Sequence, residues 1–60
     1  MNVTELMKLV DRAEDKLGEY VHAKVYGDGS GSLVDNEETE LVTWDDVNEM
    51  EKNIQSWLKE

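Results

Sequence analysis

The sequence predicts an α+β fold with the element order α-β-β-β-α, and three observations support this fold class. Apolar residues recur at steps of three and four near both ends of the chain, which is the period of a helix. Between residues 20 and 26 the period changes to two, which is the period of a strand. Two further short apolar runs follow, bounded by turn-forming residues. We therefore expect a three-stranded antiparallel meander with two helices packed on one face, as a single small domain over residues 1–60.

The first helix is expected over residues 2–18. Asn2 is suited to cap its N-terminus, with Glu5 three residues later as in a capping box. Gly18 is suited to the left-handed position that follows a last helical turn. The stripe that we expect to face the core comprises Val3, Leu6, Met7, Val10, Ala13 and Leu17.

The segment 20–26 is expected to form the first strand. Val21, Ala23 and Val25 share the face that we expect to pack on the helices, because side chains alternate along a strand. The opposite face would carry Tyr20, His22, Lys24 and Tyr26. The segments "SLVDN" and "ELVTW" predict the other two strands, joined by a turn at Asp35 and Asn36.

The last helix is expected within "TWDDVNEMEKNIQSWLKE". Thr43 or Asp45 is suited to cap it, and acidic residues in its first turn complement the helix dipole. Its apolar stripe comprises Val47, Met50, Ile54, Trp57 and Leu58.

Composition narrows the kind of function. The chain has no cysteine, so no disulfide or thiolate zinc site is expected, and a cytoplasmic location is the default. No apolar run is long enough to span a membrane, and the first residues do not resemble a signal peptide. Double-stranded RNA-binding domains share the order of elements, but they need basic residues to meet phosphates. With a net charge of −9, direct nucleic-acid binding is not expected.

The loop "YGDGSGS" at residues 26–32 raises the question of a calcium site. An EF-hand loop that began at Asp28 would need glycine at its sixth position and glutamate at its twelfth. Those positions hold Leu33 and Thr39. We therefore expect no metal here, and a mobile hairpin connection in which Gly27, Gly29 and Gly31 supply positive φ angles.

The side chains that enzymes use as nucleophiles and bases are sparse. His22 is the single histidine, and a lone histidine in a strand is more often a surface residue than a catalyst. No serine stands in a nucleophile-elbow sequence. We expect neither enzymatic activity nor a cofactor.

Negative charge is concentrated in the second half of the chain. Residues 35–51 contain no lysine or arginine, and their acids are Asp35, Glu37, Glu38, Glu40, Asp45, Asp46, Glu49 and Glu51. In the first helix, Lys8, Arg12 and Lys16 recur every four residues and are expected to pair with neighbouring acids. The acidic run has two interpretations, a device for solubility or a docking surface for a basic partner.

In size, charge and compact α+β pattern, the whole chain resembles small acidic proteins of phages and other mobile elements that inhibit host nucleic-acid-binding machinery. Targets of that group include uracil-DNA glycosylase, restriction enzymes and CRISPR effectors, and several members mimic DNA. The resemblance implies an inhibitor that occupies the basic surface of a nucleic-acid-binding protein. It includes no shared motif, so it assigns no functional residue.

The outer face of the sheet is a second candidate surface. Tyr20 and Tyr26 would lie there, and Val42 and Trp44 from the third strand are expected to join them. Tyrosine and tryptophan are favoured anchors at protein interfaces. The alternative function is therefore a structural or regulatory interaction module, including a homodimer, that uses this aromatic face.

Overall fold

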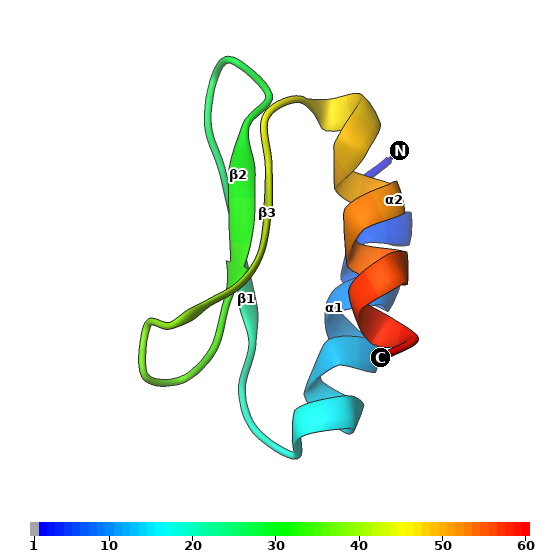
Figure 1. The fold of residues 1–60 in the computed structure, drawn as a ribbon, viewed down its shortest axis with the longest axis vertical. Helices are drawn as coiled ribbons and strands as arrows, with labels where there is room; N and C mark the ends of the chain where they lie inside the picture. The colour runs from blue at the N-terminus through cyan, green and yellow to red at the C-terminus, as the bar shows by residue number, and fades with distance from the viewer. Residues whose placement is uncertain (1) are drawn as a thin grey trace.

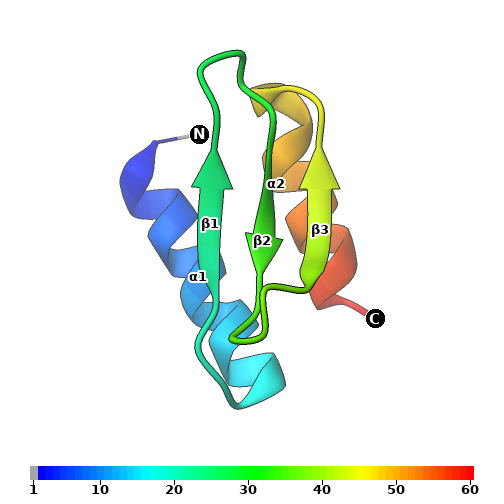
Figure 2. The same ribbon diagram turned by 90° about the vertical axis from the view of Figure 1, so that its left-hand side faces the viewer.

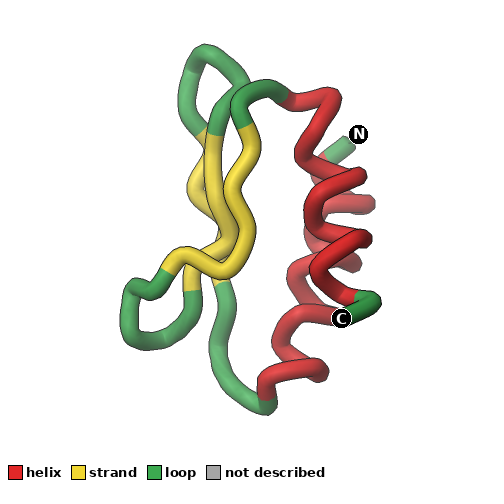
Figure 3. The backbone as a smooth tube through the Cα atoms, viewed as in Figure 1, coloured by secondary structure: helices red, strands yellow, loops and turns green. Residues whose placement is uncertain are grey.

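The computed structural model describes residues 2–60 and has two layers. The elements are α1 (Val3–Leu17), β1 (His22–Val25), β2 (Gly31–Val34), β3 (Glu40–Trp44) and α2 (Val47–Leu58). The strands lie in the order β1-β2-β3, and each pairs antiparallel with the next. Both helices lie on one side of the sheet (Figures 1 and 3). The predicted order of elements, the antiparallel meander and the placement of the helices are confirmed.

Helix α1 begins and ends where its caps predict. The Asn2 side chain accepts a hydrogen bond from the Glu5 backbone N–H at 2.9 Å, which satisfies one of the free donors of the first turn. Gly18 has a φ of 71°, and its N–H donates to the Glu14 carbonyl oxygen, which closes the last turn.

The buried face of α1 differs from the predicted stripe. Leu9 and Ala13 are buried, whereas Val3 and Met7 are 72% and 66% exposed. The reason is that α1 packs chiefly against α2. Its first turns therefore lie behind the border of the sheet and extend past β1, as Figure 2 shows. Leu17, another member of the predicted stripe, is also exposed.

Helix α2 is capped by Asp46 rather than by Thr43 or Asp45. The Asp46 side chain accepts hydrogen bonds from the backbone N–H groups of Asn48 and Glu49 at 2.8 and 3.1 Å. Because β3 continues through Trp44, the helix begins later than expected.

Lys16 of α1 stabilises the other end of α2. Its Nζ donates to the carbonyl oxygens of Trp57 and Glu60, each at 2.8 Å, and lies 4.8 Å from the centre of the Trp57 ring. A cation at this position complements the negative end of the helix dipole, and α2 has no basic residue in its own last turn. The expected pairing of Lys16 with acids of its own helix is wrong, because its Nζ bonds to these carbonyl oxygens of α2 and of Glu60 after it.

The sheet turns its Leu33 side toward the helices. The pairing register places Ala23, Leu33 and Val42 on that face, where they pack with buried α2 residues such as Ile54. Strand β2 is the central strand, and all four of its residues are buried. Along the predicted first strand, the expected inward face is correct for Val21, which directly precedes β1 and is buried, whereas Val25 is 51% exposed.

Trp44 packs closely against Gly31 in the core. These residues are opposite each other in the register of β2 and β3, and Trp44 is 3% exposed. A Cβ added to Gly31 would lie 2.9 Å from Trp44 Cζ2 and would overlap the Lys24 carbonyl oxygen. Gly31 is therefore a strand residue without room for a side chain, not the turn residue with positive φ that the sequence suggested. Trp44 and Val42 point inward, so the expectation that they join the outer face is wrong.

Gly31→Ala is expected to lower the free energy of unfolding by about 2–3 kcal/mol, because the added methyl group forces the sheet or the indole to move. Such a loss removes most of the roughly 3–5 kcal/mol that a core of this size supplies. Urea denaturation followed by tryptophan fluorescence measures it. Gly27→Ala is the matched control, since nothing lies within 4 Å of a Cβ there. A similar, small effect of the two substitutions would contradict the tight packing at Gly31.

Candidate protein-binding surface

The acidic residues of the predicted patch form two groups at opposite ends of β3. The turn group comprises Asp35, Glu37, Glu38 and Glu40, at the β2–β3 turn. The helix-start group comprises Asp45, Asp46 and Glu49, joined by Asp28 from the β1–β2 loop. Figures 1 and 3 show the β2–β3 turn at one end of the sheet and the other two segments at the opposite end. A five-residue strand spans about 17 Å, which exceeds the screening length of about 8 Å at physiological salt.

The turn group owes its shape to Asp35 and Glu38. Asp35 Oδ1 accepts hydrogen bonds from the backbone N–H groups of Glu37 and Thr39 at 2.8 and 2.9 Å. Glu38 has a φ of 66°, a left-handed conformation that a glutamate rarely adopts. Its carboxylate forms an ion pair of 2.9 Å with Lys24 Nζ. One acid of this group is therefore neutralised by a base from β1.

The ion pair shifts the titration of both partners. The hydrogen bond and the charge of Lys24 lower the pKa of Glu38, and the same two effects of Glu38 raise the pKa of Lys24. Glu38 thus contributes stability above its ordinary pKa of 4.5 and loses it as the pH falls through the lowered value. Lys24 contributes stability below 10.5 and loses it as the pH rises through the raised value.

The helix-start group is brought together by a close backbone approach. Gly29 has a φ of 92°, and a Cβ there would lie 3.2 Å from the Val47 backbone nitrogen. The β1–β2 loop therefore lies directly against the start of α2. Of the three glycines predicted to have positive φ, Gly29 alone does so.

Two carboxylates of the helix-start group are held in place. Asp28 Oδ1 accepts hydrogen bonds from the Ser30 hydroxyl at 2.6 Å and from the Ser30 backbone N–H at 3.0 Å. Both bonds favour the charged form and lower the pKa of Asp28. Asp46 is held by its capping bonds. Asp45 and Glu49 are exposed and make no side-chain hydrogen bond or ion pair with any residue from 2 to 60.

Apolar side chains flank the helix-start group. Tyr26 is 59% exposed in the β1–β2 loop, and Val47 is 45% exposed in the first turn of α2. The segments 26–30 and 45–49 contain no lysine or arginine. Exposed apolar and aromatic side chains beside unpaired carboxylates are a combination found at protein interfaces.

The two tyrosines of the predicted aromatic face do not lie together. Tyr20 precedes β1 and Tyr26 follows it, so about 20 Å of extended chain separates them. Tyr20 instead stacks on His22, with ring centres 5.5 Å apart. His22 is half-buried rather than a surface residue, and its Nδ1 has no hydrogen-bond partner among residues 2–60. With Trp44 and Val42 turned inward, no aromatic face of the expected kind is present in the described structure.

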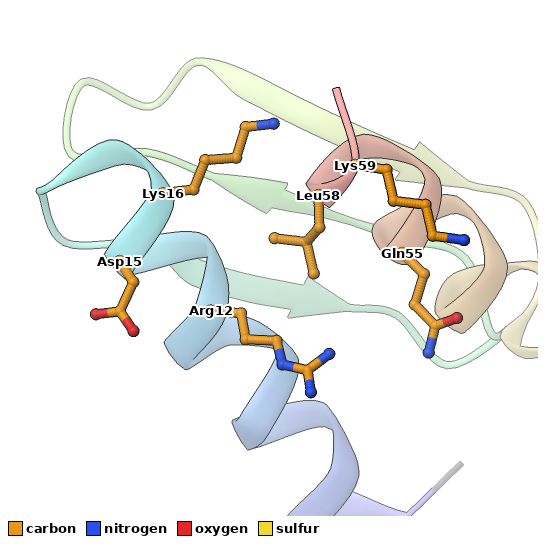
Figure 4. A pocket seen from close by; sticks show the side chains of 6 residues that line it. All are labelled: Arg12, Asp15, Lys16, Gln55, Leu58 and Lys59. Carbon is orange, nitrogen blue, oxygen red and sulfur yellow. The ribbon is translucent and has the colours of Figure 1, made fainter.

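A different groove lies between the two helices, and its charged residues are mostly basic. The groove has a volume of about 620 Å³ and is lined by Arg12, Asp15, Lys16, Gln55, Leu58 and Lys59. Figure 4 shows the Arg12 and Gln55 side chains directed toward each other across it, while Asp15 points away. Lys16 in this groove is bound to the carbonyl oxygens at the end of α2, and neither acidic group contributes a residue to the lining.

Within residues 2–60, no cluster of three or more histidine, cysteine or acidic side chains has a geometry that holds a metal ion. No helix in the same range is long and apolar enough to cross a membrane. Comparisons with protein-family models, with curated proteins and with solved structures find no match to this chain. The case for a binding surface therefore rests on the geometry of the described residues alone.

Glu38→Gln is expected to destabilise the protein at neutral pH, because it removes the charge that pairs with Lys24. The difference in unfolding free energy from the wild type should vanish as the pH falls below the lowered pKa of Glu38. Thermal unfolding between about pH 3 and pH 8 measures it. Glu37→Gln is the matched control, because Glu37 is exposed and has no ion pair with residues 2–60. Identical pH profiles for the two variants would show that the ion pair contributes nothing.

Proposed function

We propose that this protein is a small, non-enzymatic inhibitor that binds a basic surface of a nucleic-acid-binding protein through its helix-start group. The observation that supports this most directly is the close backbone approach of two segments, 26–30 and 45–49, that together contain four acidic residues and no lysine or arginine. Such a group attracts a basic surface over a longer range than a hydrogen bond and speeds the encounter.

Preorganisation favours the helix-start group as a binding surface. Asp28 and Asp46 are held by hydrogen bonds to the backbone, so little side-chain freedom is lost when they meet a partner. Each carboxylate retains oxygen lone pairs for an arginine or lysine. Fixed carboxylates at a protein edge can take the positions that phosphates occupy in a nucleic-acid-binding groove.

The helix-start group is favoured over the turn group by its charge and its neighbours. In the turn group, Glu38 is paired with Lys24, which lowers the local negative charge. The helix-start group has no such base, and Tyr26 and Val47 add apolar contact area beside it. Acidic residues set the rate and specificity of association, whereas buried aromatic anchors supply most of the affinity.

Non-enzymatic action is part of the proposal. The Ser30 hydroxyl near the helix-start group donates to Asp28, and the lowered pKa of that carboxyl makes it a weak base for activating a hydroxyl. His22 stands at the opposite end of β1. We also include a cytoplasmic location, because a chain without cysteine has no need of an oxidising compartment.

Charge reversal at the two ends of the sheet tests the proposal. Asp45→Lys combined with Glu49→Lys should abolish capture of a basic partner from a bacterial lysate at about 50 mM salt. Both side chains are exposed and make no hydrogen bond or ion pair with residues 2–60, so the variant should remain folded by circular dichroism. The wild type should lose the same partner when the salt is raised to about 500 mM or when duplex DNA is added, because DNA competes for the same basic surface.

Glu37→Lys combined with Glu40→Lys is the matched control, since it changes the net charge equally at the other end of β3. It should keep the partner. If both variants lost the partner equally, binding would depend on net charge alone and not on the helix-start group. A partner retained by the helix-start variant or at high salt would contradict the proposal.

A further inference from the structure

The two edges of the sheet are not alike. At the β3 edge, Asn53 of α2 donates from Nδ2 to the Thr43 carbonyl oxygen at 3.0 Å, so a side chain of the helix satisfies an outward backbone group. The β1 edge has no proline, no acidic residue between 20 and 27 and no bulge in its pairing with β2. Prolines, charged side chains and bulges protect edge strands from pairing with other chains. Of these features, β1 has only the charged side chain of Lys24.

The backbone groups that point outward from β1 follow from the register. Tyr26 N–H donates across the hairpin to the Ser30 carbonyl oxygen, and antiparallel strands alternate between inward and outward groups. The N–H and C=O groups of Ala23 and Val25 therefore point away from β2. The same alternation turns the Val21 N–H outward, where it meets Glu14 Oε2 at 3.2 Å.

An apolar groove runs beside this free edge. It has a volume of about 420 Å³ and lies between β1 and residues 6–14 of α1. Leu6, Met7 and Val10 line its α1 side, and Tyr20 and Ala23 line its β1 side. Figure 2 shows α1 in the layer behind the sheet with its first turns extending past β1. A strand added to β1 would thus lie over apolar side chains that are exposed or half-buried.

We infer that the β1 edge binds an extended segment of another protein as a fourth strand. The backbone of that segment pairs with the outward N–H and C=O groups of Ala23 and Val25. Its apolar side chains, at every second position, lie over Met7 and Val10. Addition of a strand to a free edge is a general mode of peptide recognition, in which backbone bonds give affinity and the alternate side chains give selectivity.

Charge complementarity indicates a basic segment. The formally charged residues that line the groove are Asp11 and Glu14, both acidic. The occupant therefore alternates apolar residues with lysine or arginine. A second copy of this chain fits less well. Each copy has an α1 helix that extends past its β1 edge, so symmetric pairing of two β1 strands would bring both helices into the same space. This binding does not depend on the helix-start group, which lies on other segments.

A library of random twelve-residue peptides displayed on phage, selected against the intact protein, tests the inference. The selection should enrich sequences with apolar residues at alternate positions, lysine or arginine between them and no central proline. When the synthesised peptide binds, amide hydrogen exchange should slow at Ala23 and Val25. Exchange at Lys24 should stay unchanged, since its N–H already bonds to β2.

Val25→Pro removes an outward N–H without removing a bond of the sheet, and it should weaken peptide binding by at least about tenfold. Val25→Thr keeps the N–H and the shape of the side chain, so its binding should match the wild type. Equal binding by both variants, absence of an alternating motif, or unchanged exchange at Ala23 in the wild-type complex would overturn the inference. So would sedimentation showing a dimer that Val25→Pro dissociates, because the edge would then belong to a second copy.

Discussion

The packing of the Trp44 indole against Gly31 is the constraint on which the rest of this structure depends. The two residues are opposite each other on neighbouring strands, and the ring occupies the space that a side chain at Gly31 would need. The indole Nε1 is buried without a hydrogen-bond partner among residues 2–60, so shape and apolar contact hold the ring in place. Once Trp44 points inward, alternation along β3 turns Val42 inward as well.

The distribution of acids follows from that inward turn. Since β3 extends to Trp44, the next two residues, Asp45 and Asp46, make the connection to α2, and Asp46 becomes its cap. The β1–β2 loop, which precedes Gly31, then lies against the start of α2 and brings Asp28 to the same end. A chain with a net charge of −9 thereby separates its acids into two groups and uses several of them to close turns and helices.

Local signals made the helices and the order of elements predictable from the sequence. The Asn2 cap and Gly18 mark α1 within its own first and last turns, and the change of period marks β1. The inward direction of Trp44 was not predictable, because the partner that makes room for it is a glycine that reads as part of a turn. A register irregularity between β2 and β3 was a second feature that the sequence did not indicate. It lets Leu41 pack on the core beside Val42.

The candidate site was partly predictable. The acidic run indicated residues 35–51, but a count of charges cannot show that a strand divides them, nor that Lys24 neutralises Glu38. Asp28 was missed as a member because the contact of its loop with the start of α2 is non-local and is made at Gly29. Similarly, the role of Lys16 at the end of α2 joins residues 41 and 44 positions apart, and no pattern along one helix contains that information.

The most direct test of this account is a proton NMR measurement of Gly31 and Trp44 in solution. The inward packing of Trp44 predicts nuclear Overhauser contacts between the Gly31 α protons and the Trp44 ring protons, with the Gly31 resonances displaced by the ring current. A contact between the Gly29 α protons and the Val47 amide proton is also expected, because the loop lies against α2. Ordinary Gly31 shifts and a solvent-exposed indole would contradict the inward turn of Trp44 and, with it, the approach of the β1–β2 loop to the start of α2.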